Sequence, residues 1–323
     1  VYVAEAGNDG TECETGTEGP VCYGLTSGIS RIDSGGHVSR VISGLLSDGP
    51  PGGSGTIGAD DLSFFGDHLY VLEGETPEKL PTGSKISPST LAKIKLEAGS
   101  LGVFDFHGHG SLVAHVGSFD YQWAKEHASL VPGQFPDANP YAVLAVPQGE
   151  LIADAGANTL DFVDQWGHVH VLAFVPNPPT SPSAPPGYVA DSVPTCLAKG
   201  PDGAIYIGEL TGAFAAPNSS IVWRWTPSGG LKEWASGLQS VTGCGFGPEG
   251  QFYAVEFSTL GLNSAAPETG AIVRVPPHST KPETVVSKLS FPGGFVTTSN
   301  AGYVANWSIA PAENHGGCDA PVG

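Results

Sequence analysis

The chain is poor in charged residues, and positive charge is the scarcest. Of its 323 residues 14% are charged, with 13 Lys and Arg against 32 Asp and Glu, which gives a formal net charge of −19. Phosphate contacts need clustered Lys and Arg, so this composition argues against a nucleic-acid binder. It argues equally against an anionic membrane surface as partner. No run of about 18 apolar residues occurs, so we predict no membrane-spanning helix.

Common catalytic and metal-binding motifs are also missing. The sequence contains no C-x2-C pair, no G-x-S-x-G, no P-loop and no H-E-x-x-H. These absences weaken the zinc-finger, serine hydrolase, nucleotide-binding and zincin hypotheses. Methionine is absent even at the first position, so we expect Val1 to be a processed or trimmed start. Apolar residues make up 40% of the chain, enough for a sizeable core.

The five cysteines and the acidic balance favour a secreted or extracytoplasmic protein. Cys13 and Cys22 flank the polar segment TECETGTEGPVC, which gains order from a covalent clip, so we predict a disulfide between them. Cys196 and Cys244 occupy corresponding segments of two successive repeats. They either form a second disulfide or are two small buried thiols. Cys318 is left over and could pair outside this chain.

A short strand pattern recurs six times along the chain. Each copy runs apolar, often Tyr, apolar, small, and then ends in an acid or Asn. Another apolar run and a Gly-rich turn precede most copies, and hairpins follow several of them, which predicts units of four antiparallel strands, A to D. The recurring second strands, B, are Val1–Glu5, Leu69–Glu73, Leu151–Asp154, Ile205–Glu209, Phe252–Glu256 and Gly302–Asn306.

Repeated four-stranded units about 40–50 residues long predict an all-β protein, a β-propeller. Six copies of strand B favour six blades in a single domain over residues 1–323. The first unit lacks its strand A and the last lacks strands C and D, so closure with five blades is the alternative. A β-helix is the other repeat architecture considered, but its repeats are shorter. No helix pattern of more than about ten residues occurs except at Phe119–Leu130.

The long segments all fall on one face of the predicted propeller. In an up-and-down blade the B–C loops and the D–A links share a face, and long loops on a rigid scaffold usually carry function. The two B–C loops are Gly7–Ser27 and Gly74–Ser100, and the two D–A links are Gly117–Pro140 and Val175–Ser192. We therefore expect the protein to act through this long-loop face.

The acids that end strand B are the first candidate site residues. A ring of carboxylates could bind a hard cation such as Ca²⁺, or supply an acid and base pair. The competing interpretation is structural, because an acid repeated in every blade usually binds neighbouring backbone. The candidate metal ligands are Glu5, Glu73, Asp154, Glu209 and Glu256, of which Asp154, Glu209 and Glu256 are also the catalytic candidates.

Residues that other blades do not share are the second set of candidates, since a binding site needs asymmetry. The third unit contributes Asn139, Tyr141 and Asn158 near Asp154. Trp123 and Tyr188 lie in the long D–A links, where exposed aromatic rings suit sugars or apolar ligands. The alternative is that these loops pack their own side chains onto the propeller.

Two histidine pairs could begin a zinc or copper site. His168 and His170 form H-x-H on one strand face, and His107 and His109 lie in FHGHG. Both pairs fall at C–D turns near the rim, so we interpret them as solvated hairpin residues.

Three long motifs give the chain a family resemblance. They are VYVAEAG at the start, ANPYAVLAVPQGELIADAGAN, and SVPT-x-LAKGPDGAIYIGELTG, with the segment C…GPVCYG between the first two. Together they resemble the secreted ScyD/ScyE-type proteins, named after the gene cluster for the sunscreen scytonemin. The resemblance implies a secreted propeller with NHL-like repeats. It implies no reaction and no catalytic residue.

Three functions are compatible with these patterns. The leading hypothesis is an extracellular propeller that binds a small molecule, a glycan or a partner protein on its long-loop face. The second is a metal-assisted hydrolase or lyase with its site at the channel mouth. The third is a structural component of a cell wall or matrix.

Overall fold

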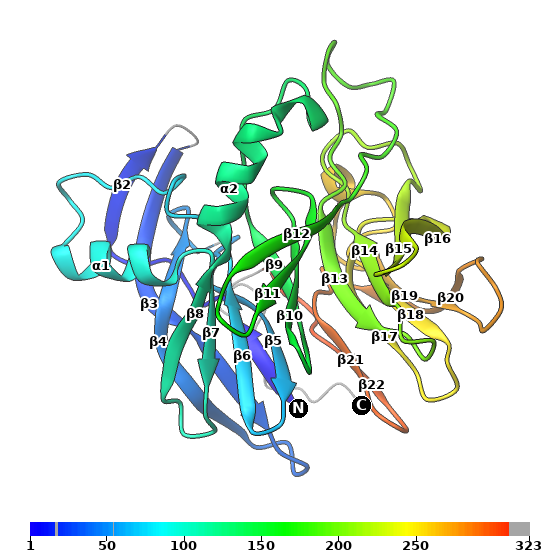
Figure 1. The fold of residues 1–323 in the computed structure, drawn as a ribbon, viewed down its shortest axis with the longest axis horizontal. Helices are drawn as coiled ribbons and strands as arrows, with labels where there is room; N and C mark the ends of the chain where they lie inside the picture. Colours follow the sequence, from blue (N-terminus) through cyan, green and yellow to red (C-terminus); the bar gives the residue numbers. More distant parts are fainter. Residues whose placement is uncertain (17–18, 54, 310–323) are drawn as a thin grey trace. The chain divides into compact units, whose positions relative to one another are not determined.

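The computed structural model describes residues 1–16, 19–53 and 55–309. The expectation for Cys318 falls outside these ranges. The described chain divides into two compact units, the first formed by Val1–Ser118 with Ile309 and the second by Phe119–Ser308 (Figure 1). A single domain over residues 1–323 stays a prediction.

The first unit contains two four-stranded antiparallel sheets. In the first sheet β3 is long enough to pair with three other strands, while the second sheet is a simple meander. The first sheet comprises β1 (Tyr2–Glu5), β2 (Glu12–Gly16), β3 (Gly19–Ile32) and β4 (Val38–Gly49), and the second comprises β5 (Ala59–Phe65), β6 (His68–Glu73), β7 (Ser100–Phe104) and β8 (Gly110–His115).

The second unit contains three four-stranded meanders and a two-stranded sheet. The meanders are β9 (Pro140–Val146), β10 (Gly149–Asp154), β11 (Thr159–Asp164) and β12 (Val169–Phe174); β13 (Pro194–Lys199), β14 (Ile205–Glu209), β15 (Ser220–Thr226) and β16 (Gly230–Leu238); and β17 (Val241–Phe246), β18 (Phe252–Glu256), β19 (Gly270–Val275) and β20 (Glu283–Leu289). The two-stranded sheet is β21 (Phe295–Thr297) with β22 (Gly302–Val304).

These sheets are the blades of an all-β propeller fold, as the repeats predicted. All six copies of the strand B pattern form strands, from β1 to β22. Five sheets have four strands, which matches the five-bladed alternative, and the sixth pattern forms only the two-stranded sheet among the described residues. In the first sheet no described strand occupies the position of strand A, as expected.

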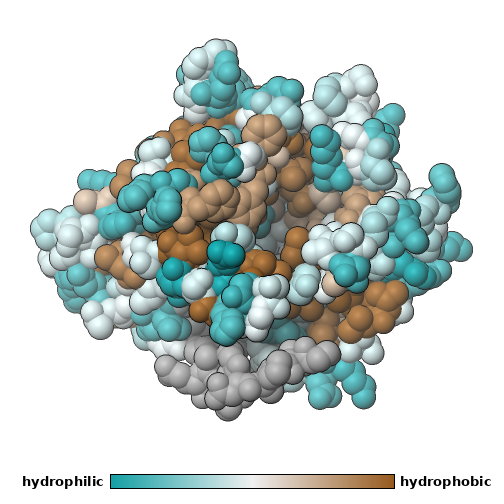
Figure 2. All heavy atoms as spheres, turned by 90° about the horizontal axis from the view of Figure 1, so that it is seen from below, coloured by the Kyte–Doolittle hydropathy of each residue, from teal (hydrophilic) through white to brown (hydrophobic). Residues whose placement is uncertain are grey.

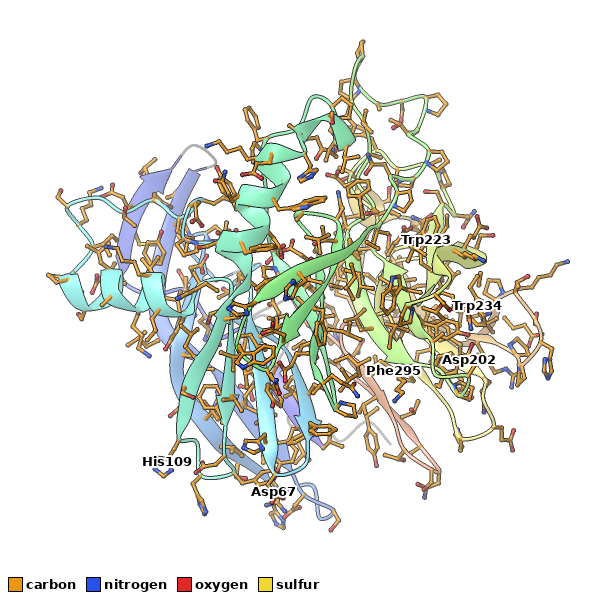
Figure 3. The ribbon with its side chains drawn as sticks, viewed as in Figure 1. Asp67, His109, Asp202, Trp223, Trp234 and Phe295 are labelled. Atoms are coloured by element: carbon orange, nitrogen blue, oxygen red, sulfur yellow. A yellow bond between two sulfur atoms is a disulfide. The ribbon has the colours of Figure 1, made fainter. Side chains whose placement is uncertain are left out.

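Each blade is held by apolar side chains that alternate along its strands and pack in the interior. In the second unit, Tyr206 lies with its ring centroid 4.8 Å from those of both Trp234 and Phe246. Phe252, which is fully buried, belongs to the same cluster. Figure 3 labels Trp234 among these strands.

Two disulfides are present, the predicted Cys13–Cys22 bond and a Cys196–Cys244 bond, which was one of the two alternatives for that pair. Cys13 and Cys22 are directly opposite each other on β2 and β3, so they clip a hairpin in the first unit. Cys196 on β13 and Cys244 on β17 join two neighbouring blades of the second unit. The alternative of two free buried thiols is wrong.

Three C–D turns share one hydrogen-bonding pattern, which the sequence shows as D-x-x-G-H. In each turn one oxygen of the Asp accepts the backbone N–H groups two and four residues later, while the other contacts the His ring. The ring nitrogen lies 3.1–3.3 Å from that oxygen. The glycine has a positive φ in all three. The turns are Asp33–His37, Asp105–His109 and Asp164–His168.

The helices lie in the long segments. The expected helix is α2 (Val116–Glu126), while α1 (Pro88–Glu97) lies inside the B–C loop of the second blade and was not predicted. Ser87 caps α1 by accepting the backbone N–H of Thr90, and Pro88 follows at the first helical position. The 3₁₀ turns are η1 (Ala128–Leu130) and η2 (Leu262–Ser264). Among the described residues, no helix is long and apolar enough to cross a membrane.

Candidate functional site

Most of the side chains that end strand B bind other residues of their own blades. In the second unit, three of these positions accept a backbone N–H group from the segment that leads into strand A of the same blade. This contact ties the entry of a blade to the end of its second strand. The pairs are Asp154 with Asn139 (2.8 Å), Glu256 with Gln239 (2.9 Å) and Asn306 with Ser290 (2.8 Å).

Glu209 binds its neighbouring strand instead. One oxygen accepts the backbone N–H of Ile221 at 3.0 Å and the other accepts the indole N–H of Trp223. Trp223 is labelled in Figure 3. Burial raises the pKa of Glu209 to about 8 in spite of these two donors. In the first unit, Glu5 is more exposed and forms an ion pair with Arg40 at 2.7 Å.

Glu73, the remaining acid, lies buried in the first unit. Its Oε1 has no hydrogen-bond partner, and burial raises the pKa of its carboxyl well above the usual range. Within the described ranges, no group of three or more His, Cys, Asp or Glu side chains is arranged to hold a metal ion. Ca²⁺ binding and catalysis by these acids stay predictions.

A second group of buried acids surrounds Asp154, and the sequence reasoning missed it. Ile152 is directly opposite Asp161 in the β10–β11 ladder, so Asp154 and Asp161 project from the same sheet face. Asp120 of α2 lies within hydrogen-bond reach of both carboxyls. All three Asp side chains are fully buried. Spacing in the sequence gives no sign of this group, because Asp120 belongs to a D–A link and the others to a blade.

The three carboxyls of this group have different surroundings. Oδ1 of Asp154 accepts the backbone N–H groups of Asn139, Gly156 and Ala157 at 2.7–2.8 Å. Burial raises the pKa of Asp154 to about 6, the backbone donors opposing a larger rise. Burial raises the pKa of Asp120 and Asp161 well above the usual range. Asp154 is therefore the group that holds a negative charge most readily.

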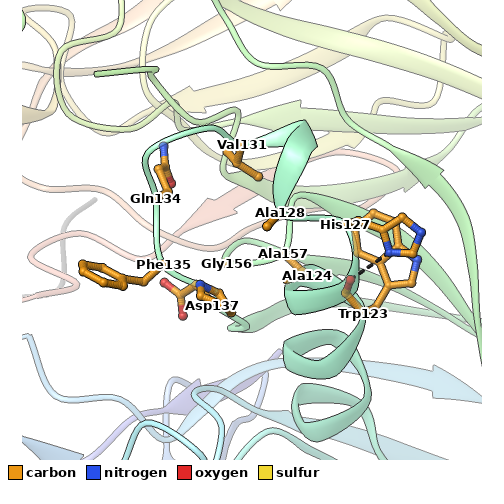
Figure 4. Close-up of a pocket in the computed structure, with 11 residues that line it drawn as sticks. Trp123, Ala124, His127, Ala128, Val131, Gln134, Phe135, Asp137, Gly156 and Ala157 are labelled. Carbon is orange, nitrogen blue, oxygen red and sulfur yellow. Dashed lines mark hydrogen bonds between the residues drawn. The ribbon is translucent and has the colours of Figure 1, made fainter. Parts of the chain in front are cut away.

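The long D–A link from α2 to β9 forms a small pocket in the second unit (Figure 4). Trp123 and His127 stack on its rim with ring centroids 4.2 Å apart. The His127 Nδ1 lies 2.8 Å from the carbonyl oxygen of Trp123. The enclosed space measures about 10 Å³, which holds about one water molecule. The lining is completed by η1, the segment 131–137 and the turn at Gly156 and Ala157.

Phe135 is the most exposed large apolar side chain in the described part of the chain, at 91% exposure. Figure 4 shows its ring at the pocket rim, away from the other labelled aromatic side chains. Figure 2 shows further apolar side chains on one face of the surface, interspersed with polar ones. Sequence reasoning singled out Trp123 in this link but missed Phe135, because exposure is a property of the fold.

The structure separates the other predicted ligand-binding residues by their roles. Asn158 is fully buried, donates to Asp191 Oδ1 at 3.2 Å and accepts the backbone N–H of Val193 at 2.9 Å. It therefore ties the β10–β11 turn to the Pro-rich link. Tyr188 in that link packs edge-on against Phe214, with ring centroids 5.3 Å apart.

Two candidates of the third blade lie at the start of its first strand. Asn139 immediately precedes β9, and Tyr141 lies within it; both side chains are half-buried. Asn139 gives its backbone N–H to Asp154. Ligand binding by Asn139, Tyr141, Asn158, Trp123 and Tyr188 stays a prediction.

Both histidine pairs lie exposed at C–D turns, as interpreted from the sequence. His109, labelled in Figure 3, contacts Asp105 at 3.1 Å. His168 and His170 both lie 3.2 Å from Asp164 Oδ2, whose pKa is lowered by backbone and His hydrogen bonds against a desolvation effect that raises it. Each pair is therefore anchored to an acid of its own hairpin.

Comparison with known proteins supports the fold and no more. No family model matches the chain, and no curated protein matches it. A chain in the crystal structure of a nidogen/laminin complex is similar at 11% identity and a TM-score of 0.54, covering 89% of this chain and 85% of that one. This likeness agrees with the propeller fold that the ScyD/ScyE resemblance implied, while the relationship to that family stays a prediction.

Two enzymes show weaker structural similarity. Virginiamycin B lyase from Staphylococcus aureus is 14% identical with a TM-score of 0.44, covering 97% of this chain and 90% of that one. Aldose sugar dehydrogenase from Streptomyces coelicolor, in its PQQ-bound form, is 14% identical with a TM-score of 0.47, covering 77% and 74%. No reaction is transferred from either.

Proposed function

We propose that this chain is an extracytoplasmic propeller protein that binds a partner protein through the surface around α2. This α2 surface consists of α2, η1, residues 131–137 and the turn at residues 155–157. The observation that carries the proposal is the 91% exposure of Phe135 at the rim of the pocket that the stacked Trp123 and His127 also line. Exposed aromatic residues of this kind are the usual energetic anchors of protein interfaces.

The size of the pocket favours a protein over an enclosed small ligand. Pockets for small molecules usually measure about 300–1,000 Å³. The enclosed space here is about 10 Å³, so a ligand must contact the rim from outside. A broad partner surface can do so, with Phe135 inserting into the partner and not the reverse.

Charge indicates what kind of partner would fit. The chain has a formal net charge of −19, and Glu126 and Asp137 lie on or beside the α2 surface. A partner with a basic rim around an apolar cleft would be attracted to this surface, and its association rate would fall with added salt. The two disulfides support an oxidising, extracytoplasmic setting. The likeness to a chain of the nidogen/laminin complex concerns the fold alone, and it supports protein binding only because that fold occurs there in a protein complex.

The test places a photo-crosslinking amino acid at position 135 and exposes the protein to the extracellular fraction of its source. The partner identified by mass spectrometry is then purified and its affinity measured against the wild type and two variants. We expect Phe135→Ala to weaken binding at least about tenfold. The matched control is Val296→Ala, which removes another exposed apolar side chain of the same unit.

Two results would overturn the proposal. Equal affinity of the Phe135→Ala and Val296→Ala variants would remove the α2 surface from the interface. Binding to immobilised oligosaccharides that depends on Trp123, without a protein crosslinked from position 135, would establish a glycan as the ligand instead. Exposed aromatic rings can bind a protein or a glycan, so the crosslinking and the oligosaccharide-binding experiments use the same variants.

The hydrolase or lyase hypothesis has its own test. Asp154, Glu209 and Glu256 are buried and engaged with backbone or indole donors. Loss of activity in their variants would therefore not separate catalysis from folding. Elemental analysis after gel filtration, with a chelator-treated control, tests directly for a bound metal and needs no variant. A stoichiometric metal would favour the enzyme.

A further inference from the structure

A second pocket lies in the first unit, beside the C–D turns of its two blades. It encloses about 560 Å³. Pockets for small molecules usually measure about 300–1,000 Å³, so this one has room for a ligand that the pocket beside α2 excludes. One wall comes from β1, β3 and β4, and the other from the β7–β8 turn. Figure 3 labels His109 in that turn.

The strands contribute a row of side chains on one face of the first sheet. Tyr2 on β1 is directly opposite Arg31 on β3, and Arg31 is directly opposite Ser39 on β4. Residues that pair directly project from the same sheet face. A phenol, a guanidinium and a hydroxyl therefore lie side by side, and all three line the pocket.

The β7–β8 turn forms the other wall because it packs closely on β4. Gly108 has a φ of +82°, and a Cβ atom built on it would lie 2.7 Å from the carbonyl oxygen of Val41. Only glycine fits such a close approach of two backbones. The two residues before it, Phe106 and His107, then line the pocket opposite the row of strand side chains.

Phe106 belongs to an aromatic cluster that is only partly covered. Its ring centroid lies 6.0 Å from that of Phe64, with the rings stacked, and 6.4 Å from that of Tyr2. Even so, Phe106 is 45% exposed. Aromatic rings gain from offset or edge contacts with a further ring, so a ring-bearing ligand would extend this cluster.

Arg31 supplies a positive charge that no acid of its own sheet binds. The other three arginines each form an ion pair within their own blade: Arg40 with Glu5 at 2.7 Å, Arg224 with Asp202 at 2.7 Å, and Arg274 with Glu283 at 2.9 Å. In the part of the chain that the structure describes, the Arg31 side chain forms no hydrogen bond or ion pair. Asp33 is the acid that interacts with it electrostatically, but both Asp33 oxygens contact their own turn.

We propose that this pocket binds a small ring-bearing monocarboxylate. The carboxylate pairs with the guanidinium of Arg31, whose planar fork matches two carboxylate oxygens. The ring packs against Phe106 and Tyr2, and the Ser39 hydroxyl lies beside Arg31 to donate a further hydrogen bond. A single negative charge fits best, because a formal net charge of −19 repels a polyanion. The site belongs to the first unit, so it is independent of the proposed α2 surface.

The test is isothermal titration calorimetry with three probes. They are 2-naphthoate, its neutral analogue 2-naphthalenemethanol, and glucuronate, a sugar acid. We expect a saturable site for one of the two acids, and at least about tenfold weaker binding of the neutral analogue than of naphthoate if naphthoate is the ligand. Preference for naphthoate identifies the ring as aromatic, and preference for glucuronate identifies it as a sugar.

Variants locate the site. Arg31→Gln should weaken binding of the preferred acid at least about tenfold, and Arg31→Lys, which keeps the charge, should recover part of the loss. Phe106→Ala should weaken it about fivefold. Two controls should leave the affinity unchanged. Lys95→Gln removes an exposed positive charge of the same unit, and Phe65→Ala removes a ring of similar exposure, 43%, that does not line the pocket.

Three results would overturn the proposal. The first is no saturable binding of either acid up to about 10 mM. The second is binding of 2-naphthalenemethanol as tight as that of both acids, because the carboxylate would then contribute nothing. The third is equal affinity of the Arg31→Gln and Lys95→Gln variants, or of the Phe106→Ala and Phe65→Ala variants, since the ligand would then bind elsewhere.

Discussion

Oδ1 of Asp154 lies 2.8 Å from the backbone nitrogen of Asn139, which joins the end of β10 to the chain that enters β9. Gln239 and Ser290 make the matching contact with Glu256 and Asn306 in the later blades of the same unit. A carboxylate or amide at this position therefore closes the base of a blade. This role explains why the acid recurs without any need for a shared active site.

Replacing Asp154 tests this brace. Asp154→Ala leaves the buried N–H groups of Asn139, Gly156 and Ala157 without an acceptor. We expect it to lower the free energy of unfolding by about 3–5 kcal/mol. Asp154→Asn retains an oxygen at the same place and should cost clearly less. Urea titrations of both variants measure the difference, and equal stability of Asp154→Ala and wild type would contradict the brace.

Stability should fall as pH rises, with Glu209 as one source. Burial raises the pKa of Glu209 from 4.5 to about 8 in the folded protein. A raised folded-state pKa gives stability that is complete below the unfolded value and is lost as pH rises through the folded value. Between these two values the loss attributable to this one group is about 1.4 kcal/mol per pH unit. Glu209→Gln cannot ionise, so this contribution to the pH dependence of stability should be absent from that variant.

The measurement is the melting temperature at several pH values from about 4.5 to about 8. The slope should be shallower in Glu209→Gln than in wild type. The control is Glu268→Gln, which removes an exposed acid of the same unit and should leave the slope unchanged. Parallel slopes in all three proteins would assign the pH effect to other groups.

Asn158 should be sensitive to two separate changes. Its φ of 59° is left-handed, and its side chain binds Asp191 and Val193. Glycine adopts this left-handed φ without strain, so Asn158→Gly loses only the two side-chain hydrogen bonds. Asn158→Ala loses the same bonds and also strains the backbone. We expect about 1–3 kcal/mol for the glycine variant and about 1 kcal/mol more for alanine. Thermal melts give the order, and an alanine variant as stable as glycine would rule out the strain.

The two disulfides should contribute unequally. Cys196–Cys244 closes a 48-residue separation and Cys13–Cys22 one of 9. On the chain-entropy estimate, replacing Cys196 and Cys244 by alanine lowers the free energy of unfolding by about 4 kcal/mol, and replacing Cys13 and Cys22 lowers it by about 2.5 kcal/mol. Denaturation of the two double variants measures this order. A larger loss from the shorter loop would show that native contacts, and not chain entropy, dominate.

Much of the fold could be predicted from the sequence, because its signals are local and repeated. Alternating apolar residues before a terminal acid or Asn identified all six B strands, and a polar loop between Cys13 and Cys22 identified the first disulfide. The signal for α1 was also present, since Ser87 and Pro88 form a standard helix start, but the weakly periodic residues that follow conceal it.

The candidate site was less predictable. Asp161 lies near Asp154 because β10 pairs with β11, and Asp120 approaches both only because α2 packs against these strands. The exposure of Phe135 depends on the path of the whole D–A link. Both are results of tertiary packing, for which sequence spacing contains no signal.

The disulfide between β13 and β17 also has a mechanical consequence. If the chain is pulled from its ends, the force passes through the disulfide, and the segment between Cys196 and Cys244, a separation of 48 residues, carries no load. At roughly 3.4 Å per extended residue, this removes about 160 Å from the length that can be released. An oxidised molecule under tension would therefore stretch less than a reduced one, and its β13–β16 blade would be shielded from the load.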